Sequence, residues 1–150
     1  MTDLFRKLTL GAAGSLALTI GFAITAVPAA FHATNGIALG TDPTLLSEIR
    51  APGAMLAASG GVILAGAIRR GMARLSAILG ALVFLSYAAG RIVGATLDGL
   101  PADGIIAATV IELVIGGLCA ATLMEPRAGL WLWRHKARSG LPVRPDHSGA

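Results

Sequence analysis

Four long apolar stretches, separated by short polar segments, constrain this chain of 150 residues more than any other feature of its sequence. They cover about residues 8–30, 51–68, 75–97 and 105–124. A helix of about 20 apolar residues crosses the hydrocarbon core of a bilayer, which is ~30 Å thick. The alternating segments of about ten residues that build a membrane β-barrel are absent from the sequence. The pattern therefore predicts an all-α, polytopic membrane protein with four transmembrane helices in an antiparallel bundle.

The composition argues against a soluble globular domain. Hydrophobic residues make up 55% of the chain and charged residues only 13%, and the mean hydropathy is +0.74. A soluble domain needs more charged residues than this to cover its surface. The isoelectric point of about 10.2 does not indicate nucleic acid, because the basic residues flank apolar segments and aromatic residues are scarce. We expect these basic flanks to contact the anionic headgroups of the lipid bilayer.

The basic residues also predict an orientation in the membrane. Ten of the twelve Lys and Arg residues precede the first apolar stretch or follow an even number of crossings. These ten are Arg6, Lys7, Arg69, Arg70, Arg74, Arg127, Arg134, Lys136, Arg138 and Arg144. The positive-inside rule then places both termini in the cytoplasm, as in a multi-pass protein of an inner membrane.

The character of the chain changes at about residue 125. Residues 1–125 form the predicted four-helix transmembrane domain, and residues 126–150 form a cytoplasmic tail. Trp131 and Trp133 lie among basic residues in this tail, an arrangement that is typical of the membrane interface. Beyond Ser139 the composition is that of a disordered segment.

The first apolar stretch has a second interpretation. Basic residues precede it and small residues follow it at 28–30, as in a cleaved secretory signal. However, the stretch is longer than the usual core of such a signal. Ala17, Gly21 and Thr25 also recur at four-residue spacing, which suits packing against another helix. We therefore expect the stretch to be retained as the first transmembrane helix.

The segment between the first two stretches carries turn and capping signals. Asn35-Gly36 predicts a turn. Either Thr41 or Asp42 is a suitable N-cap for a short helix over residues 43–50, which leads into the second crossing. We expect Pro52 to kink the junction between that short helix and the crossing.

Small residues recur at four-residue spacing inside the predicted crossings. Such faces let helix backbones approach closely in lipid, where burial away from water no longer drives helix association. We expect these faces to pack within the bundle, and a homodimer interface is the alternative. The residues are Gly53, Ala57, Gly61, Gly90, Gly94 and Gly116, with Gly60 adjacent to the first face.

Two arginines depart from the charge sorting, and both lie near acidic residues on the predicted outer side. At ~1.5 Å per residue, Arg91 and Glu112 lie roughly 9 Å and 12 Å below the outer ends of their helices. An unpaired charge at that depth is costly, so we expect an ion pair between them. The sequence thus predicts a charged cluster in the outer half of the bundle. Its members are Glu48, Arg50, Tyr87, Arg91, Asp98 and Glu112.

This cluster has three interpretations. The first is a structural ion pair that sets the register of two helices, and the second is a polar pocket for a small ligand or a lipid headgroup. The third is a small proton-coupled transporter that uses Glu112. An adjacent arginine makes Glu112 a poor proton carrier, because a carrier carboxylate must take up a proton during each cycle.

The sequence carries no recognisable catalytic or cofactor-binding motif. A nucleophile elbow, a phosphate loop and a dinucleotide fingerprint are all absent. His32, His135 and His147 lie too far apart in sequence to indicate a metal site, and Cys119 is expected to pack as a small apolar side chain. The sequence therefore favours a non-enzymatic accessory or ligand-binding protein, without a cofactor and without nucleic acid as a partner.

Several of these features resemble DUF4345, a family of small four-helix bacterial membrane proteins of unknown function. The similar residues are Pro28, Arg50-Ala51, Gly90-Arg91, Asp98-Gly99, Pro101 and Glu112. The chain departs from the family pattern after Pro52, where Gly53-Ala54-Met55 replaces an aromatic-Gly-Gly step. The resemblance covers about residues 8–124 and implies the four-helix topology and the charged cluster, but no activity. A looser likeness to DoxX-like proteins raises a redox or quinone-associated membrane subunit as an alternative.

Overall fold

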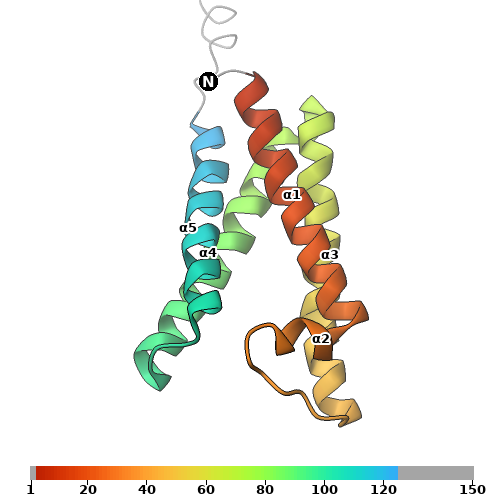
Figure 1. The fold of residues 1–150 in the computed structure, drawn as a ribbon. Helices are drawn as coiled ribbons and strands as arrows, with labels where there is room; N and C mark the ends of the chain where they lie inside the picture. The colour runs from red at the N-terminus through yellow and green to blue at the C-terminus, as the bar shows by residue number, and fades with distance from the viewer. Residues whose placement is uncertain (1–2, 125–150) are drawn as a thin grey trace, which may run out of the picture.

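The computed structural model describes residues 3–124, which fold into helices and connecting segments without a strand (Figure 1). The four long helices are α1 (Asp3–Ala26), α3 (Pro43–Ile68), α4 (Ala73–Asp98) and α5 (Asp103–Leu123). A short helix, α2 (Pro28–Ala33), follows α1, and a 3₁₀ turn, η1 (Arg70–Met72), joins α3 to α4. All four long helices are long and apolar enough to cross a membrane. The predicted all-α class with four such helices is confirmed, whereas the predicted tail at 126–150 lies outside the described residues.

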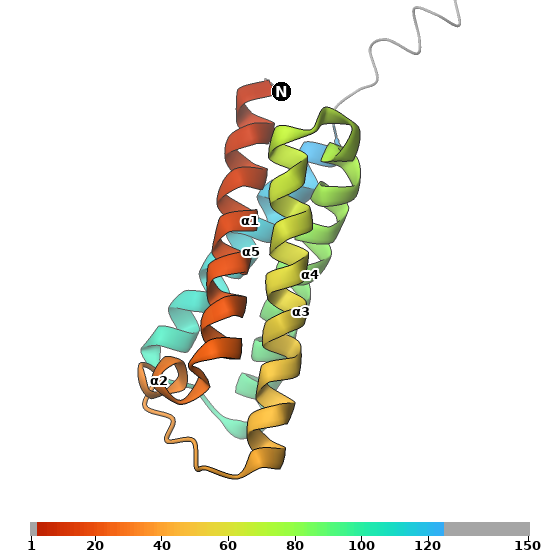
Figure 2. The ribbon, with the colours of Figure 1, turned by 90° about the vertical axis from the view of Figure 1, so that its right-hand side faces the viewer.

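The long helices run up and down in two adjacent pairs. The first pair is α1 with α3, and the second is α4 with α5 (Figures 1 and 2). The pairs lie close together at the end that carries the N-terminus and diverge at the opposite end (Figure 1). We call that opposite end, which carries α2 and the α4–α5 turn, the α2 end.

The first crossing differs from its expected bounds. Helix α1 begins at Asp3 and ends at Ala26, earlier at both ends than residues 8–30. Pro28 lies two residues beyond the end of α1, in the first turn of α2. Proline lacks an N–H, so it cannot donate to the carbonyl four residues earlier in α1, and the chain starts a new helix instead.

The second crossing and the expected short helix before it are one continuous helix. Asp42 is the N-cap of α3, and its Oδ1 accepts a hydrogen bond of 2.8 Å from the N–H of Leu45. Pro43 occupies the first turn, as the capping signal predicts. Pro52 lies inside α3 without ending it, so the boundary expected at residue 51 does not exist.

Glycines bring α1 and α3 into backbone contact. A Cβ atom at Gly14 would collide with the backbone of Leu64, and one at Gly21 would collide with that of Ala57. From the other side, a Cβ at Gly60 would collide with the backbone of Leu18. The packing predicted for the small residues of the first stretch is therefore present, and it joins α1 to α3 over much of their length.

Glycines also allow close packing of the second helix pair, α4 and α5, but at fewer positions. A Cβ at Gly116 of α5 would lie 2.7 Å from the side chain of Leu85 in α4. Cys119 is fully buried against Gly80, where an added Cβ would lie 2.9 Å from its sulfur. Cys119 therefore packs as a small apolar side chain, as expected. Gly53, by contrast, meets the side chains of Ile24 and Thr25 in α1.

Three of the expected packing glycines make no close contact within the described part of the chain. A Cβ atom at Gly61, Gly90 or Gly94 would meet nothing within 4 Å among residues 3–124. For Gly61 the reason is helical geometry, because seven residues from Gly53 return within about 20° of the same direction but eight rotate about 80° away. Gly60, and not Gly61, therefore continues the face that Gly53 begins. The homodimer alternative stays a prediction for the open positions.

Polar contacts connect the ends of the helices near the N-terminus. Arg6 donates a hydrogen bond of 2.6 Å from Nη1 to the carbonyl oxygen of Gly66, in the last turn of α3. Carbonyl groups in a last turn lack helical donors, so a cation there satisfies them. Asp3 forms ion pairs with Arg6 at 2.7 Å and with Lys7 and Arg70 at 3.2 Å. These contacts hold α1 beside the α3–α4 connection.

We predict that Gly60→Ala destabilises the protein, whereas the neighbouring Gly61→Ala does not. The added methyl group at position 60 collides with the backbone of α1, and overpacking of this kind costs about 1–3 kcal/mol. At position 61 the space is open, and alanine is the better helix former by up to about 1 kcal/mol. Thermal unfolding of both variants in detergent, followed by circular dichroism, measures the difference. Equal midpoints for the two variants would contradict the backbone contact between α1 and α3 at Gly60.

Candidate functional site

A cavity of about 500 Å³ lies between the two helix pairs. All four long helices and α2 contribute to its lining. The lining is mainly apolar and includes Leu16, Ile20 and Ile24 of α1, Leu56 of α3, Phe84 of α4, and Ile105 and Ile111 of α5. Its polar members are His32, Asn35, Glu48, Tyr87, Arg91 and Glu112. A volume between about 300 and 1,000 Å³ with few polar groups is typical of a small-molecule site.

The polar and apolar linings lie at different depths. At 1.5 Å per residue, Glu48 lies about 8 Å, Arg91 about 10 Å and Glu112 about 14 Å from the α2-end terminus of its helix. By the same rise, Leu56 and Phe84 lie about 20 Å from those termini, near the middle of the bundle. The cavity therefore has a polar outer part towards the α2 end and an apolar inner part.

The central polar contact is the ion pair between Arg91 of α4 and Glu112 of α5. The Nε–H of Arg91 donates to both carboxylate oxygens, at 3.1 Å to Oε1 and 3.0 Å to Oε2. The side chains are 29% and 12% exposed, so the pair is largely removed from solvent. Removing two charges from water is costly, and mutual pairing offsets that cost. The ion pair expected from the depth argument is present, and it connects α4 to α5 where the two helix pairs diverge.

Glu48 and Tyr87 lie around this pair, as the cluster hypothesis expects. Both side chains line the cavity, and Tyr87 is one helical turn before Arg91 on α4. Glu48 is exposed and enters from α3, opposite the α4–α5 pair. Its carboxylate makes neither a hydrogen bond nor an ion pair with any other residue that the structure describes. Glu48 thus places an uncompensated negative charge at the mouth of the cavity.

Two further polar lining residues, His32 and Asn35, come from the α2 region. The His32 ring packs edge-on against Phe31, with ring centroids 5.6 Å apart, and its buried Nε2 has no hydrogen-bond partner among residues 3–124. Asn35 lies against the start of α5, where a Cβ atom at Gly104 would be 2.8 Å from Oδ1 of Asn35. Asn35 therefore borders the cavity near the start of α5. His32 lies in α2 and Asn35 follows it, and no sequence pattern predicts that either residue borders the cavity.

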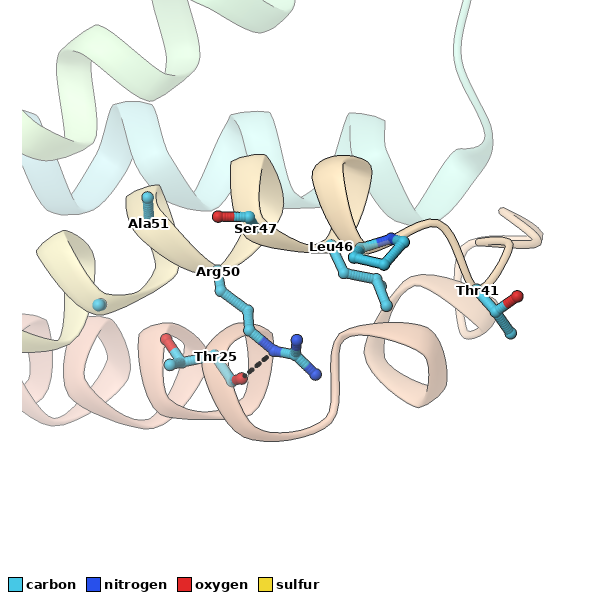
Figure 3. Close-up of a pocket in the computed structure, with 8 residues that line it drawn as sticks. Thr25, Thr41, Leu46, Ser47, Arg50 and Ala51 are labelled. Carbon is cyan, nitrogen blue, oxygen red and sulfur yellow. Dashed lines mark hydrogen bonds between the residues drawn. The ribbon is translucent and has the colours of Figure 1, made fainter.

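Arg50 does not join the cluster, which corrects the sequence hypothesis. Its Nε donates a hydrogen bond of 3.2 Å to the carbonyl oxygen of Thr25, in the last turn of α1 (Figure 3). This oxygen lies at a helix end, where backbone acceptors lack intrahelical donors and attract cations. Arg50 borders a separate surface hollow on the α1–α3 pair, together with Thr41 and Ser47 (Figure 3). It links α1 to α3 and does not neutralise an acid.

Asp98 is also outside the cavity. It is the exposed last residue of α4 and forms no ion pair among residues 3–124. Gly99 follows it with a positive φ of 98°, a conformation that favours glycine after a helix end. Asp98 shares a helix face with Arg91 at a spacing of seven residues, but about 10 Å of helix rise separates the two. The charged group therefore reduces to Glu48, Arg91 and Glu112, with Tyr87 beside them.

The described residues around the cavity offer few chemically distinctive groups. Within residues 3–124, no group of three or more His, Cys, Asp or Glu side chains has the geometry of a metal site. Cys119 is fully buried in the core, away from the cavity lining. The cavity offers a large apolar surface, one internally neutralised ion pair and one additional carboxylate.

These features define a helical bundle of the membrane-spanning class with an internal, amphipathic cavity. Residues 5–123 match the model of a protein family described as a domain of unknown function (DUF4345). The chain therefore belongs to the DUF4345 family, as its resemblance in sequence implies. Comparisons with curated proteins and with solved structures give no significant match.

We predict that Arg91→Met and Glu112→Leu each destabilise the protein more than the double substitution does. Each single change leaves one largely buried charge without its partner, at a cost on the order of 2–3 kcal/mol, whereas two apolar side chains can pack together. Unfolding of the purified protein by a denaturing detergent gives the three free-energy changes of this double-mutant cycle. Single effects that simply add in the double variant would contradict coupling between the two charges.

Proposed function

We propose that this protein binds a small amphiphilic molecule, such as a lipid or a lipid-soluble metabolite, in the cavity between its two helix pairs. The supporting observation is the position of the cavity, whose apolar part lies near the middle of the bundle and whose polar part lies at the α2 end. A molecule with an apolar body and a polar head matches this arrangement along its length. In this proposal the protein is a non-enzymatic binding or accessory component of the membrane.

The geometry of Glu112 favours binding over proton-coupled transport. A carboxylate that carries protons must exchange them with its surroundings, whereas both oxygens of Glu112 accept from the Arg91 N–H. The cavity is also bounded on the inner side by the buried core, which includes Leu10, Ala13 and Ile63. We therefore assign Glu112 a structural and binding role.

We further propose that the protein spans a bacterial inner membrane four times, with its N-terminus and its α3–α4 connection in the cytoplasm. The support is the clustering of Arg69, Arg70 and Arg74 at that connection and of Arg6 and Lys7 beside the start of α1. The α2 end, and with it the polar mouth of the cavity, then faces the outer side. The bilayer itself is the partner on the remaining apolar surface.

Cysteine labelling in intact bacterial cells tests this orientation. Thr41→Cys and Gly71→Cys place a thiol at exposed positions at opposite ends of the bundle, and the native Cys119 is buried. We expect a membrane-impermeant maleimide to label position 41 in intact cells and position 71 only after permeabilisation. The reverse pattern would overturn the proposed orientation.

Occupancy of the cavity is testable with a matched pair of substitutions on α5. Ala108 lines the cavity one turn before Glu112, whereas Ala107 is exposed and does not line it. We expect the protein purified in a mild detergent to retain a bound amphiphile, which native mass spectrometry detects. Ala108→Phe fills the cavity and should remove this species, while Ala107→Phe should keep it.

The outcomes of this experiment separate loss of binding from loss of folding. Both variants are first compared with the native chain by thermal unfolding and by size-exclusion chromatography. Retention of the same species by a folded Ala108→Phe variant would place the molecule elsewhere on the surface. Absence of any bound species in the native chain, even after addition of lipid extract, would refute the proposal.

A further inference from the structure

The charges around the cavity restrict the head of the molecule that it binds. The described lining contains one guanidinium, on Arg91, two carboxylates, on Glu48 and Glu112, and the imidazole of His32. Arg91 already pairs with Glu112 through two hydrogen bonds of 3.0–3.1 Å, so these two charges cancel. The charge that stays uncompensated within the described residues is negative and belongs to Glu48.

The position of Glu48 makes its charge effective at the cavity mouth. It lies on α3, across the cavity from the α4–α5 ion pair, and about 8 Å along the helix from Pro43. Arg50, the nearest cation in sequence, does not form an ion pair with it, and its Nε–H donates instead to the carbonyl oxygen of Thr25 (Figure 3). Residues two apart on a helix also point in different directions.

An anionic head is poorly suited to this environment. A phosphate or carboxylate group would be repelled by Glu48 and would compete with Glu112 for Arg91, which would leave Glu112 unpaired and partly buried. An ammonium head has the opposite properties. It donates hydrogen bonds to the Glu48 carboxylate, compensates its charge and leaves the Arg91–Glu112 pair intact.

We propose that the cavity selects amphiphiles with a primary ammonium head, which binds at Glu48 while the apolar body extends towards Leu56 and Phe84. This inference rests on the proposed binding function and gives that function a ligand class. A neutral hydroxyl head ranks second, because it donates a hydrogen bond without charge compensation. A carboxylate head ranks last.

Three probes with the same alkyl chain test the ranking: dodecylamine, dodecanol and dodecanoate. Adduct formation is measured at neutral pH by native mass spectrometry of the full-length protein, and adducts that persist in Ala108→Phe are subtracted as surface binding. We expect dodecylamine to bind about 1.5-fold to fivefold more tightly than dodecanol, the range for an ion pair near the surface. Dodecanoate should bind more weakly than both.

Neutralising one acid at a time then identifies the residue that causes the preference for dodecylamine. Glu48→Gln should abolish the preference for dodecylamine over dodecanol, because a neutral amide does not compensate the charge of an ammonium head. Asp98→Asn is the matched control, because Asp98 is an exposed acid at the same end that does not line the cavity. It should retain the native preference.

Different results would refute the selection for an ammonium head and the binding function itself. Binding of dodecanoate as tightly as dodecylamine, or an unchanged preference in Glu48→Gln, would overturn the selection for an ammonium head while the cavity would still bind amphiphiles. If none of the three probes forms an adduct that Ala108→Phe removes, the binding function itself is refuted.

Discussion

Backbone contact between α1 and α3 is the constraint on which the rest of the bundle depends. In a bilayer, burial of apolar side chains does not distinguish protein from lipid, so helices associate through close van der Waals contact. Gly14 and Gly21 on one helix and Gly60 on the other remove the side chains that would hold the two backbones apart. Arg50 and Arg6 add polar contacts near the two ends of this pair. The pair forms one continuous wall of the cavity.

The opposite wall is held together by different means. Gly116 and Gly80 allow close packing of α4 and α5 nearer the N-terminal end, but at the α2 end the link is the Arg91–Glu112 ion pair. Because the two helix pairs diverge there, the space between them is not filled by their own side chains. The same ion pair therefore supports the α4–α5 wall and provides the polar surface of the site. A structural and a binding interpretation of these charges are compatible.

Membership of the DUF4345 family names no activity for the chain. The evidence for a role comes from the site itself, in which a mainly apolar cavity ends in a small number of charged groups. The sequence departure at Gly53-Ala54-Met55 falls on the α1–α3 wall of the cavity, since Gly53 lines the cavity and packs against Ile24. A larger side chain at position 53 would meet Ile24, so this stretch of the wall depends on the glycine.

The amino-acid sequence by itself determined the number of apolar helices, their turns and the depth of Arg91 and Glu112, because each depends on local patterns with a known rise per residue. That depth was sufficient to predict the ion pair. Sequence could not show that Arg50 reaches the carbonyl of Thr25, or that Asn35 and His32 border the cavity. These facts depend on how each helix is rotated about its axis and on where a connecting segment folds back. Only packing between distant parts of the chain decides such rotations, because local residue patterns leave several faces nearly equivalent.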